Sequence, residues 1–331
     1  MAEPGSGAAG TAGAAGWAHA PERSNMLALR FICWVALRFG RRATRTILYP
    51  VCLYFLLFMP RVRLNARRYL ERVLGRRAGW GDVYRLLLSF GSTVLDRVYF
   101  LRGHLHLFDV RVSGQAPVET EAVEGRGAIM LGAHIGSFEA LGACKQQSAD
   151  QEGLRIAMLM FIGNAQRIME ILNAISIPRM RPNVIALGQP HSMLELRDWL
   201  DGGGLGGLLA DRTLPAGEDP TGQSRGSAVV LPFLGQPATF NDGPFRLAAI
   251  LRRKVFFMAG LYVGGHRYDV LFEPLADFTE RVKDPAEWER RIRAAVQAYV
   301  SRLEALCRAY PYNWFNFHDF WLEDAPSSKD S

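Results

Sequence analysis

Residues 128–140 read Ala-Ile-Met-Leu-Gly-Ala-His-Ile-Gly-Ser-Phe-Glu-Ala, and this stretch decides the fold. A short apolar run ends in a turn that contains glycine, and the pattern then suits the start of a helix. The turn presents His134, and Glu139 follows five residues later. A buried strand that passes through a glycine turn into a helix is typical of an α/β protein.

The same alternation of strand and helix continues along the chain. Apolar residues at helical spacing predict an amphipathic helix over 82–102. Strands are predicted at 127–133, 155–161, 184–187, 204–210, 254–262 and 268–272. Further helices are predicted at 137–147, 165–175, 193–200, 244–252 and 285–310. This order predicts an α/β fold with a mixed, mostly parallel central sheet flanked by helices.

Polar residues follow several of the predicted strands directly. His134, Asn164 and the pair Asp211-Arg212 each come just after a strand. Ligands of such sheets sit beyond the carboxyl ends of the strands. We therefore expect these side chains to converge on one crevice.

His134 and Glu139 form a workable pair for general base catalysis. Ser137 is a plausible N-cap, which places Glu139 in the first turn of a helix, where the dipole favours a carboxylate. If the chain folds back there, Glu139 orients the imidazole, and the other ring nitrogen removes a proton from an acceptor hydroxyl. Gly136 permits close backbone approach, and free N–H groups at the helix start could stabilise an oxyanion.

Each of these residues also has a purely structural interpretation. Glu139 can simply favour a helix start, and His134 can be a satisfied turn residue. Arg212 could clamp a phosphate, and Asp211 could orient it or His134, but the two also suit a surface ion pair. Asn164, expected to contact substrate, is also a common helix cap. No spacing of His or Cys residues predicts a metal site.

The stretch 310–321 is rich in aromatic residues. Aromatic rings can wall an acyl channel or lie at a lipid headgroup interface. A C-terminal clamp that packs over the sheet explains the same residues equally well.

The N-terminal region suits a membrane surface. The chain carries a net charge of +7, with 35 arginines and four lysines. Residues 24–70 contain nine arginines, no acidic residue, and apolar runs at 26–37 and 47–59. Both runs are shorter than the roughly 20 residues that span a bilayer, so we expect N-terminal membrane-associated helices that form an interfacial or re-entrant anchor on an anionic surface. A core helix pair with a basic face is the alternative; the bulky aliphatic surroundings disfavour nucleic acid.

The chain is expected to divide into four parts. Residues 1–25 are a disordered tail without the features of a secretory signal, and residues 26–80 are the basic, apolar membrane-associated segment. Residues 81–322 form the catalytic domain, and 323–331 a second tail. Four scattered cysteines are expected to be buried thiols in a reducing compartment.

Four stretches together resemble the lysophospholipid acyltransferase superfamily. Glu139, in place of the more usual aspartate, resembles the bacterial late acyltransferases that add lauroyl or myristoyl groups in lipid A biosynthesis. The stretches cover roughly residues 26–322 and read Gly132-Ala-His-Ile-Gly-Ser-Phe-Glu, Leu208-Leu-Ala-Asp-Arg, Leu231-Pro-Phe-Leu-Gly-Gln-Pro-Ala-Thr-Phe and Pro311-Tyr-Asn-Trp-Phe-Asn-Phe.

The resemblance implies an enzyme on the cytoplasmic face of a bacterial inner membrane. It would move a fatty acyl group from acyl carrier protein or CoA to a lipid or glycolipid acceptor without a metal or other cofactor, with His134 as base and Glu139 as its partner. Two departures leave the acceptor open: Gly163-Asn164-Ala165 replaces an Arg-Pro-Asn-like element, and Asn316-Phe-His stands where lipid A enzymes tend to have basic residues. These places look closer to acyltransferases of aryl polyene or glycolipid pathways.

Two other functions suit the same residues. Water in place of the acceptor would make the protein an acyl thioesterase, although no Gly-x-Ser-x-Gly elbow supplies a serine nucleophile. A non-catalytic membrane scaffold could also keep this fold.

Overall fold

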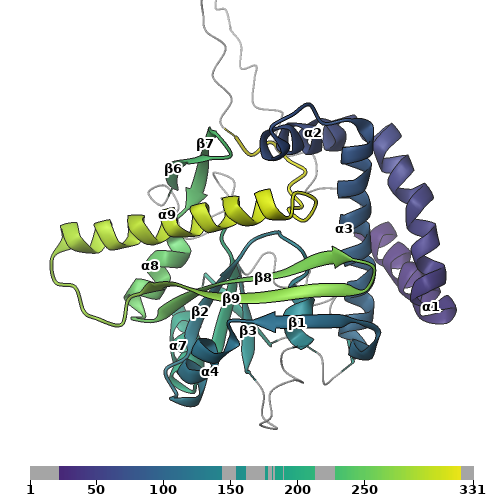
Figure 1. The fold of residues 1–331 in the computed structure, drawn as a ribbon. Helices are drawn as coiled ribbons and strands as arrows, with labels where there is room; N and C mark the ends of the chain where they lie inside the picture. Colours follow the sequence, from purple (N-terminus) through teal and green to yellow (C-terminus); the bar gives the residue numbers. More distant parts are fainter. Residues whose placement is uncertain are drawn as a thin grey trace, which may run out of the picture.

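The computed structural model describes a large part of the chain (Figure 1). The described residues are 22–143, 154–161, 176–177, 181, 183–188, 190–212 and 228–321. Most of the expected tail at 1–25, the expected tail at 323–331, the predicted helix at 165–175 and Asn164 therefore lie outside the described residues.

A seven-stranded sheet forms the centre, in the order β1-β9-β8-β2-β5-β3-β4. Among these neighbours only β8 and β9 pair antiparallel, so the predicted mixed, mostly parallel sheet is confirmed. The strands are β1 (Asp109–Ser113), β2 (Ala128–Gly132), β3 (Ile156–Phe161), β4 (Asn183–Leu187), β5 (Leu205–Leu209), β8 (Lys254–Gly264) and β9 (Arg267–Asp277). A separate hairpin joins β6 (Ala228–Phe233) to β7 (Gln236–Asn241).

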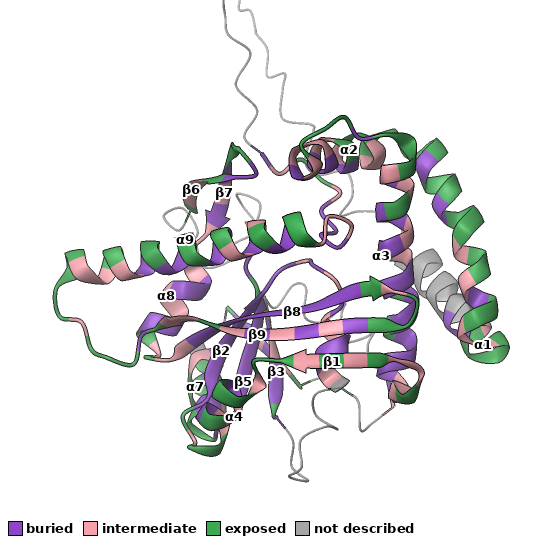
Figure 2. Cartoon of the chain, in the orientation of Figure 1, coloured by how far each residue is buried: buried purple, intermediate pink, exposed green. Residues whose placement is uncertain are grey.

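Helices cover both faces of the sheet, because alternate side chains of each strand point to opposite sides. Ile129 and Leu131 of β2 join a core with α7 and α9, whereas Met130 faces a second core with α4 and the end of α3. The α-helices are α1 (Glu22–Phe58), α2 (Pro60–Leu74), α3 (Trp80–Leu101), α4 (Gln115–Val123), α7 (Pro190–Asp201), α8 (Gly243–Ile250) and α9 (Pro285–Ala309). Figure 2 shows the burial of the central strands between these layers.

The six predicted strands are confirmed, together with the helices that became α3, α7, α8 and α9. One predicted helix is wrong in type, because 137–147 begins as a short 3-10 helix, η2 (Phe138–Ala143). The pattern missed β1, α4 and the β6–β7 hairpin. That hairpin carries Pro232 and Pro237, which weaken a strand pattern, and its turn places Leu234 and Gly235 at φ 51° and 83°.

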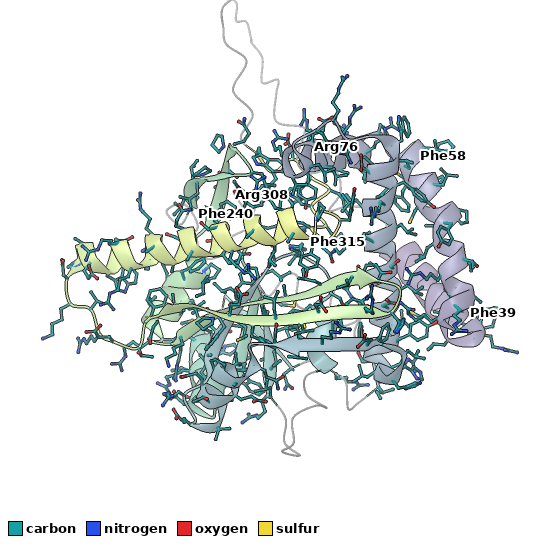
Figure 3. All side chains as sticks on the ribbon, in the orientation of Figure 1. Phe39, Phe58, Arg76, Phe240, Arg308 and Phe315 are labelled. Atoms are coloured by element: carbon teal, nitrogen blue, oxygen red, sulfur yellow. The ribbon has the colours of Figure 1, made fainter. Side chains whose placement is uncertain are left out.

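Helix α1 presents an apolar outer surface. Helix α1 bends at Gly40, whose φ of 79° and ψ of 164° interrupt the helix. Phe39 and Phe58 are 60% and 64% exposed and project away from the molecule (Figure 3). We call the following exposed side chains the α1 apolar face: Trp34, Leu37, Phe39, Ile47, Tyr49, Val51, Leu53, Tyr54, Phe55, Leu57, Phe58 and Met59.

No single helix of the described part is long and apolar enough to cross a membrane. The helix pair Cys33–Phe58 and Pro60–Leu74, bent by 95° at the break between them, has the length and composition of a broken span or a re-entrant loop.

Arginines fasten α1 to the rest of the protein. Arg41 pairs with Asp96 of α3 through Nε–Oδ1 at 2.7 Å, and the side chains are 12% and 1% exposed. Arg41 also donates to the Gly265 carbonyl oxygen in the β8–β9 turn at 2.6 Å, and Arg45 donates to that oxygen and to the Tyr262 hydroxyl. Arg41 and Arg45, two of the nine arginines of residues 24–70, are therefore bound within the protein.

Candidate functional site

His134 and Asp211 meet at the carboxyl ends of two neighbouring strands. β2 and β5 are parallel, and their last residues, Gly132 and Leu209, are partners in the ladder. His134 and Asp211 each lie two residues beyond these ends. The expectation that polar residues after the strands would converge is confirmed for these two residues.

The two residues are joined by both side-chain and backbone hydrogen bonds. Nδ1 of His134 lies 2.8 Å from Oδ1 of Asp211. The backbone N–H of His134 donates to Oδ2 of the same carboxylate at 2.9 Å. The imidazole therefore has little freedom to rotate away from Asp211.

The carboxylate of Asp211 is held as an anion. Its side chain is 1% exposed, and this burial acts to raise the pKa. The charge of His134 and the hydrogen bonds from His134 and Trp314 outweigh burial, so that the pKa of Asp211 lies below its usual value. When His134 is neutral, its Nδ1–H donates a hydrogen bond to this ionised carboxylate, and Nε2 keeps a lone pair. Because His134 is 29% exposed, it can reach an incoming substrate.

Several residues that sequence reasoning did not assign to the site support this pair. The indole Nε1 of Trp314 donates to Oδ2 of Asp211 at 3.0 Å, and Trp314 is completely buried. The backbone N–H of Phe315 donates to the His134 carbonyl oxygen at 2.8 Å. Asn313 holds the same segment to β8 through two hydrogen bonds with the Tyr262 backbone. The aromatic stretch therefore acts as the C-terminal clamp that its composition allowed.

The carboxylate that contacts the imidazole is Asp211, and the expected His134–Glu139 contact is a wrong prediction. Glu139 instead pairs with Arg97 of α3 through Nε–Oε1 at 2.7 Å, and its other oxygen accepts from the Ser137 hydroxyl at 3.1 Å. Glu139 lies in η2, and its carboxylate contacts Arg97 of α3 instead of turning back to His134.

The N–H groups of Gly136 and Ser137, at the expected helix start, both donate within the protein. The Gly136 N–H donates to the Asn313 carbonyl oxygen at 2.9 Å, and the Ser137 N–H donates to the Gly260 carbonyl oxygen at 2.7 Å. Gly136 does allow a close backbone approach, but the approach is to β8. A Cβ there would lie 2.0 Å from the Gly260 oxygen, and the φ of 64° also requires glycine. These residues hold the His134 turn in place.

Arg212 and His318 lie close enough to the His134–Asp211 pair to interact with it electrostatically. Arg212 is exposed directly after Asp211. The pKa of His318 is lowered by burial and then by the positive charge of Arg212. His318 was noted in the sequence only as a departure from a basic motif, and its electrostatic coupling to the site depends on the fold of the clamp.

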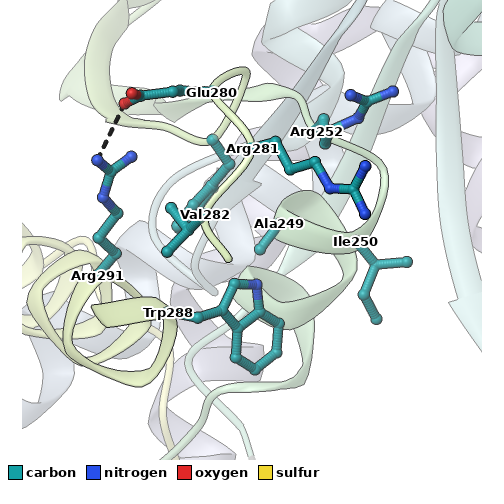
Figure 4. Close-up of a pocket in the computed structure, with 9 residues that line it drawn as sticks. Ala249, Ile250, Arg252, Glu280, Arg281, Val282, Trp288 and Arg291 are labelled. Atoms are coloured by element: carbon teal, nitrogen blue, oxygen red, sulfur yellow. Dashed lines mark hydrogen bonds and ion pairs between the residues drawn. The ribbon is translucent and has the colours of Figure 1, made fainter. Parts of the chain in front are cut away.

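The pocket in Figure 4 lies away from this pair. It has a volume of about 340 Å³ and is lined by Arg252, Arg281 and Trp288 among others. Arg252 precedes the first residue of β8, which runs parallel to β2, so the pocket lies near the amino ends of these strands. It contains none of the predicted site residues.

Metal-binding chemistry finds no support in the described part of the chain, which contains no cluster of three or more His, Cys, Asp or Glu side chains suited to a metal. Cys33, Cys52 and Cys307 are buried free thiols, as expected. Cys144 lies outside the described residues.

No family model matches the sequence, and no curated protein is significantly similar to it.

Proposed function

We propose that the protein is a membrane-associated acyltransferase that uses His134 as its general base. The observation that carries this proposal is the partly exposed imidazole held by the buried Asp211 carboxylate at 2.8 Å. A base needs one nitrogen fixed by a hydrogen bond and the other accessible to substrate. The motifs that resemble the lysophospholipid acyltransferase superfamily favour acyl transfer among the reactions such a pair can perform.

In the proposed reaction, Nε2 of His134 takes the proton of an acceptor hydroxyl or amine. The acceptor oxygen or nitrogen then forms a bond to the carbonyl carbon of an acyl thioester carried by acyl carrier protein or CoA. The C–S bond breaks, and the leaving thiolate receives the proton from the imidazolium. Asp211 stabilises the imidazolium charge throughout.

The negative charge on the carbonyl oxygen needs a donor, and the Gly136 and Ser137 N–H groups are already used. Arg212 is the candidate, since it follows Asp211 directly and its side chain is exposed. A guanidinium near the developing oxyanion stabilises it electrostatically.

The α1 apolar face supports a location at a lipid surface. Monomeric soluble proteins rarely expose large contiguous apolar patches, whereas interfacial helices combine such a face with basic residues. Arg38, Arg42 and Arg61 are exposed within or beside this face. We propose that the protein binds an anionic inner-membrane surface on its cytoplasmic side, where a lipid or glycolipid acceptor resides.

The test uses the purified full chain with vesicles, acyl-acyl carrier protein or acyl-CoA, and candidate lipid acceptors. Mass spectrometry is expected to detect an acylated lipid with the wild type and little with His134→Ala. His191→Ala, an exposed histidine on α7, serves as the matched control. If free fatty acid forms without acylated lipid, the protein is a hydrolase and the proposal of acyl transfer is wrong. If His134→Ala and His191→Ala give equal amounts of product, His134 is not the general base.

A further inference from the structure

Helix α3 carries a narrow exposed stripe beside the His134 turn. From Leu86 to Leu101, its exposed residues are Phe90, Val94 and Arg97. Their spacing of four and three residues places them on one side of the helix, over about 10 Å. The stripe is therefore apolar for most of its length and positively charged at one end.

The stripe runs alongside the segment that contains His134. At the apolar end, Phe90 packs against Phe315 with ring centroids 5.2 Å apart, and the Phe315 N–H donates to the His134 carbonyl oxygen. At the other end, Arg97 contacts Glu139 at 2.7 Å. The turn from His134 to Glu139 thus extends from one end of the stripe to the other, with the imidazole 29% exposed.

The stripe also lies next to α1. A Cβ at Gly91 of α3 would lie 3.4 Å from the Cys52 sulfur, so α1 crosses α3 beside Phe90. The neighbours of Cys52 in α1, Val51 and Leu53, belong to the exposed α1 apolar face. A molecule that leaves a lipid surface on this side would meet the apolar end of the stripe.

We propose that this stripe binds the lipid acceptor, with Phe90 and Val94 against its acyl chain and Arg97 against an anionic headgroup. This inference rests on the proposed acyl transfer. Arg97 is 46% exposed, and the contact between its Nε and Glu139 leaves terminal N–H groups of its planar fork for a phosphate. Glu139 is then a residue that positions Arg97.

The geometry favours the acceptor over the thioester donor. In acyl carrier protein and CoA, the whole pantetheine arm separates the nearest phosphate from the thioester. Arg97 is linked to the His134 turn through Glu139 and Ser137, so an anion bound there stays close to the reacting group. A headgroup phosphate near the acceptor hydroxyl satisfies this arrangement.

Steady-state kinetics separate the two substrates. Arg97→Gln is expected to raise KM for a phosphate-bearing acceptor roughly tenfold or more, because a hydrogen bond to a charged group is lost. The KM for the acyl donor and that for an uncharged acceptor of equal chain length are expected to stay unchanged. Arg97→Lys is expected to restore part of the loss. Arg111→Gln, whose side chain is 74% exposed on β1, is the matched control. If Arg97→Gln raises KM for the acyl donor, or leaves KM for the phosphate-bearing acceptor unchanged, the proposal is overturned.

A binding measurement distinguishes this inference from the proposed function. Calorimetry on His134→Ala protein with dodecyl phosphate, below its micelle concentration, is expected to give a dissociation constant that rises roughly tenfold when Arg97→Gln is added. Dodecyl glucoside, which lacks the charge, is expected to bind both proteins equally. If this difference in binding is found but the wild-type protein shows no acyl transfer, the binding stripe is retained and the proposed reaction is rejected. Equal binding of dodecyl phosphate to both proteins would reject the stripe.

Discussion

The surroundings of Asp211 and the α1 apolar face differ in how far apart in the sequence their parts lie. Asp211 receives hydrogen bonds from His134, 77 residues earlier, and from Trp314, 103 residues later. The α1 apolar face consists of residues that are close in the sequence, between Trp34 and Met59. A change near Asp211 should therefore affect both folding and chemistry, whereas a change on the α1 apolar face should affect binding with little effect on folding.

The largest expected effect is that of Asp211→Asn. The amide keeps the size of the side chain but loses the charge that stabilises the imidazolium, so kcat/KM for acyl transfer should fall roughly a thousandfold. Glu139→Gln should cost far less, because its contact is with Arg97. Equal losses of kcat/KM in the two variants would support Glu139 as the partner of His134, the role that the spacing predicted.

Arg41→Ala should cause the largest loss of stability among the changes at α1. Asp96 is 1% exposed and would keep a buried charge without its guanidinium partner, although the Tyr268 hydroxyl still donates to it. We expect the free energy of unfolding to fall by about 3 kcal/mol, measured by urea denaturation. Arg42→Ala, at the exposed neighbouring position, is the control, and an equal effect of both changes would contradict the anchoring role of Arg41.

Trp314→Phe should have a smaller effect on stability. It removes one hydrogen bond to Asp211 and part of a buried ring, while both donors of His134 remain. The free energy of unfolding should fall by about 1–2 kcal/mol, and activity should fall less than in Asp211→Asn. Trp80→Phe, at a position 56% exposed, provides the comparison. If Trp314→Phe lowers the denaturation midpoint no more than Trp80→Phe does, the hydrogen bond from the indole of Trp314 contributes nothing to stability.

The smallest effect on folding is expected for Leu57→Ser combined with Phe58→Ser. Both side chains are at least half exposed, at 50% and 64%, so the free energy of unfolding should change by no more than about 0.5 kcal/mol. Sedimentation with vesicles of phosphatidylethanolamine and phosphatidylglycerol should weaken roughly tenfold or more, since large apolar side chains are withdrawn from lipid. Val123→Ser, 81% exposed on α4, should sediment like the wild type. Unchanged sedimentation of the double variant would contradict the membrane role of this face.

Local patterns were sufficient for the strands that carry the site. The apolar runs at β2 and β5 predicted both strands, and the rule that polar residues gather at their carboxyl ends brought His134 and Asp211 together. Patterns were not sufficient for β1, an edge strand of five residues, or for α4, which has Pro117 in its first turn. β1 reads Asp-Val-Arg-Val-Ser and lacks the continuous apolar run that marks the equally short β2.

The sequence by itself determined the layered α/β fold, the position of His134 after a buried strand, and the apolar character of the N-terminal helices. Only the tertiary structure decided which carboxylate contacts the imidazole. Glu139 is near in sequence, but η2 directs it to Arg97, whereas the pairing of β2 with β5 brings Asp211 to Nδ1. The physical reason is that hydrogen bonds between strands join distant residues, and no local spacing records which distant residues will be neighbours.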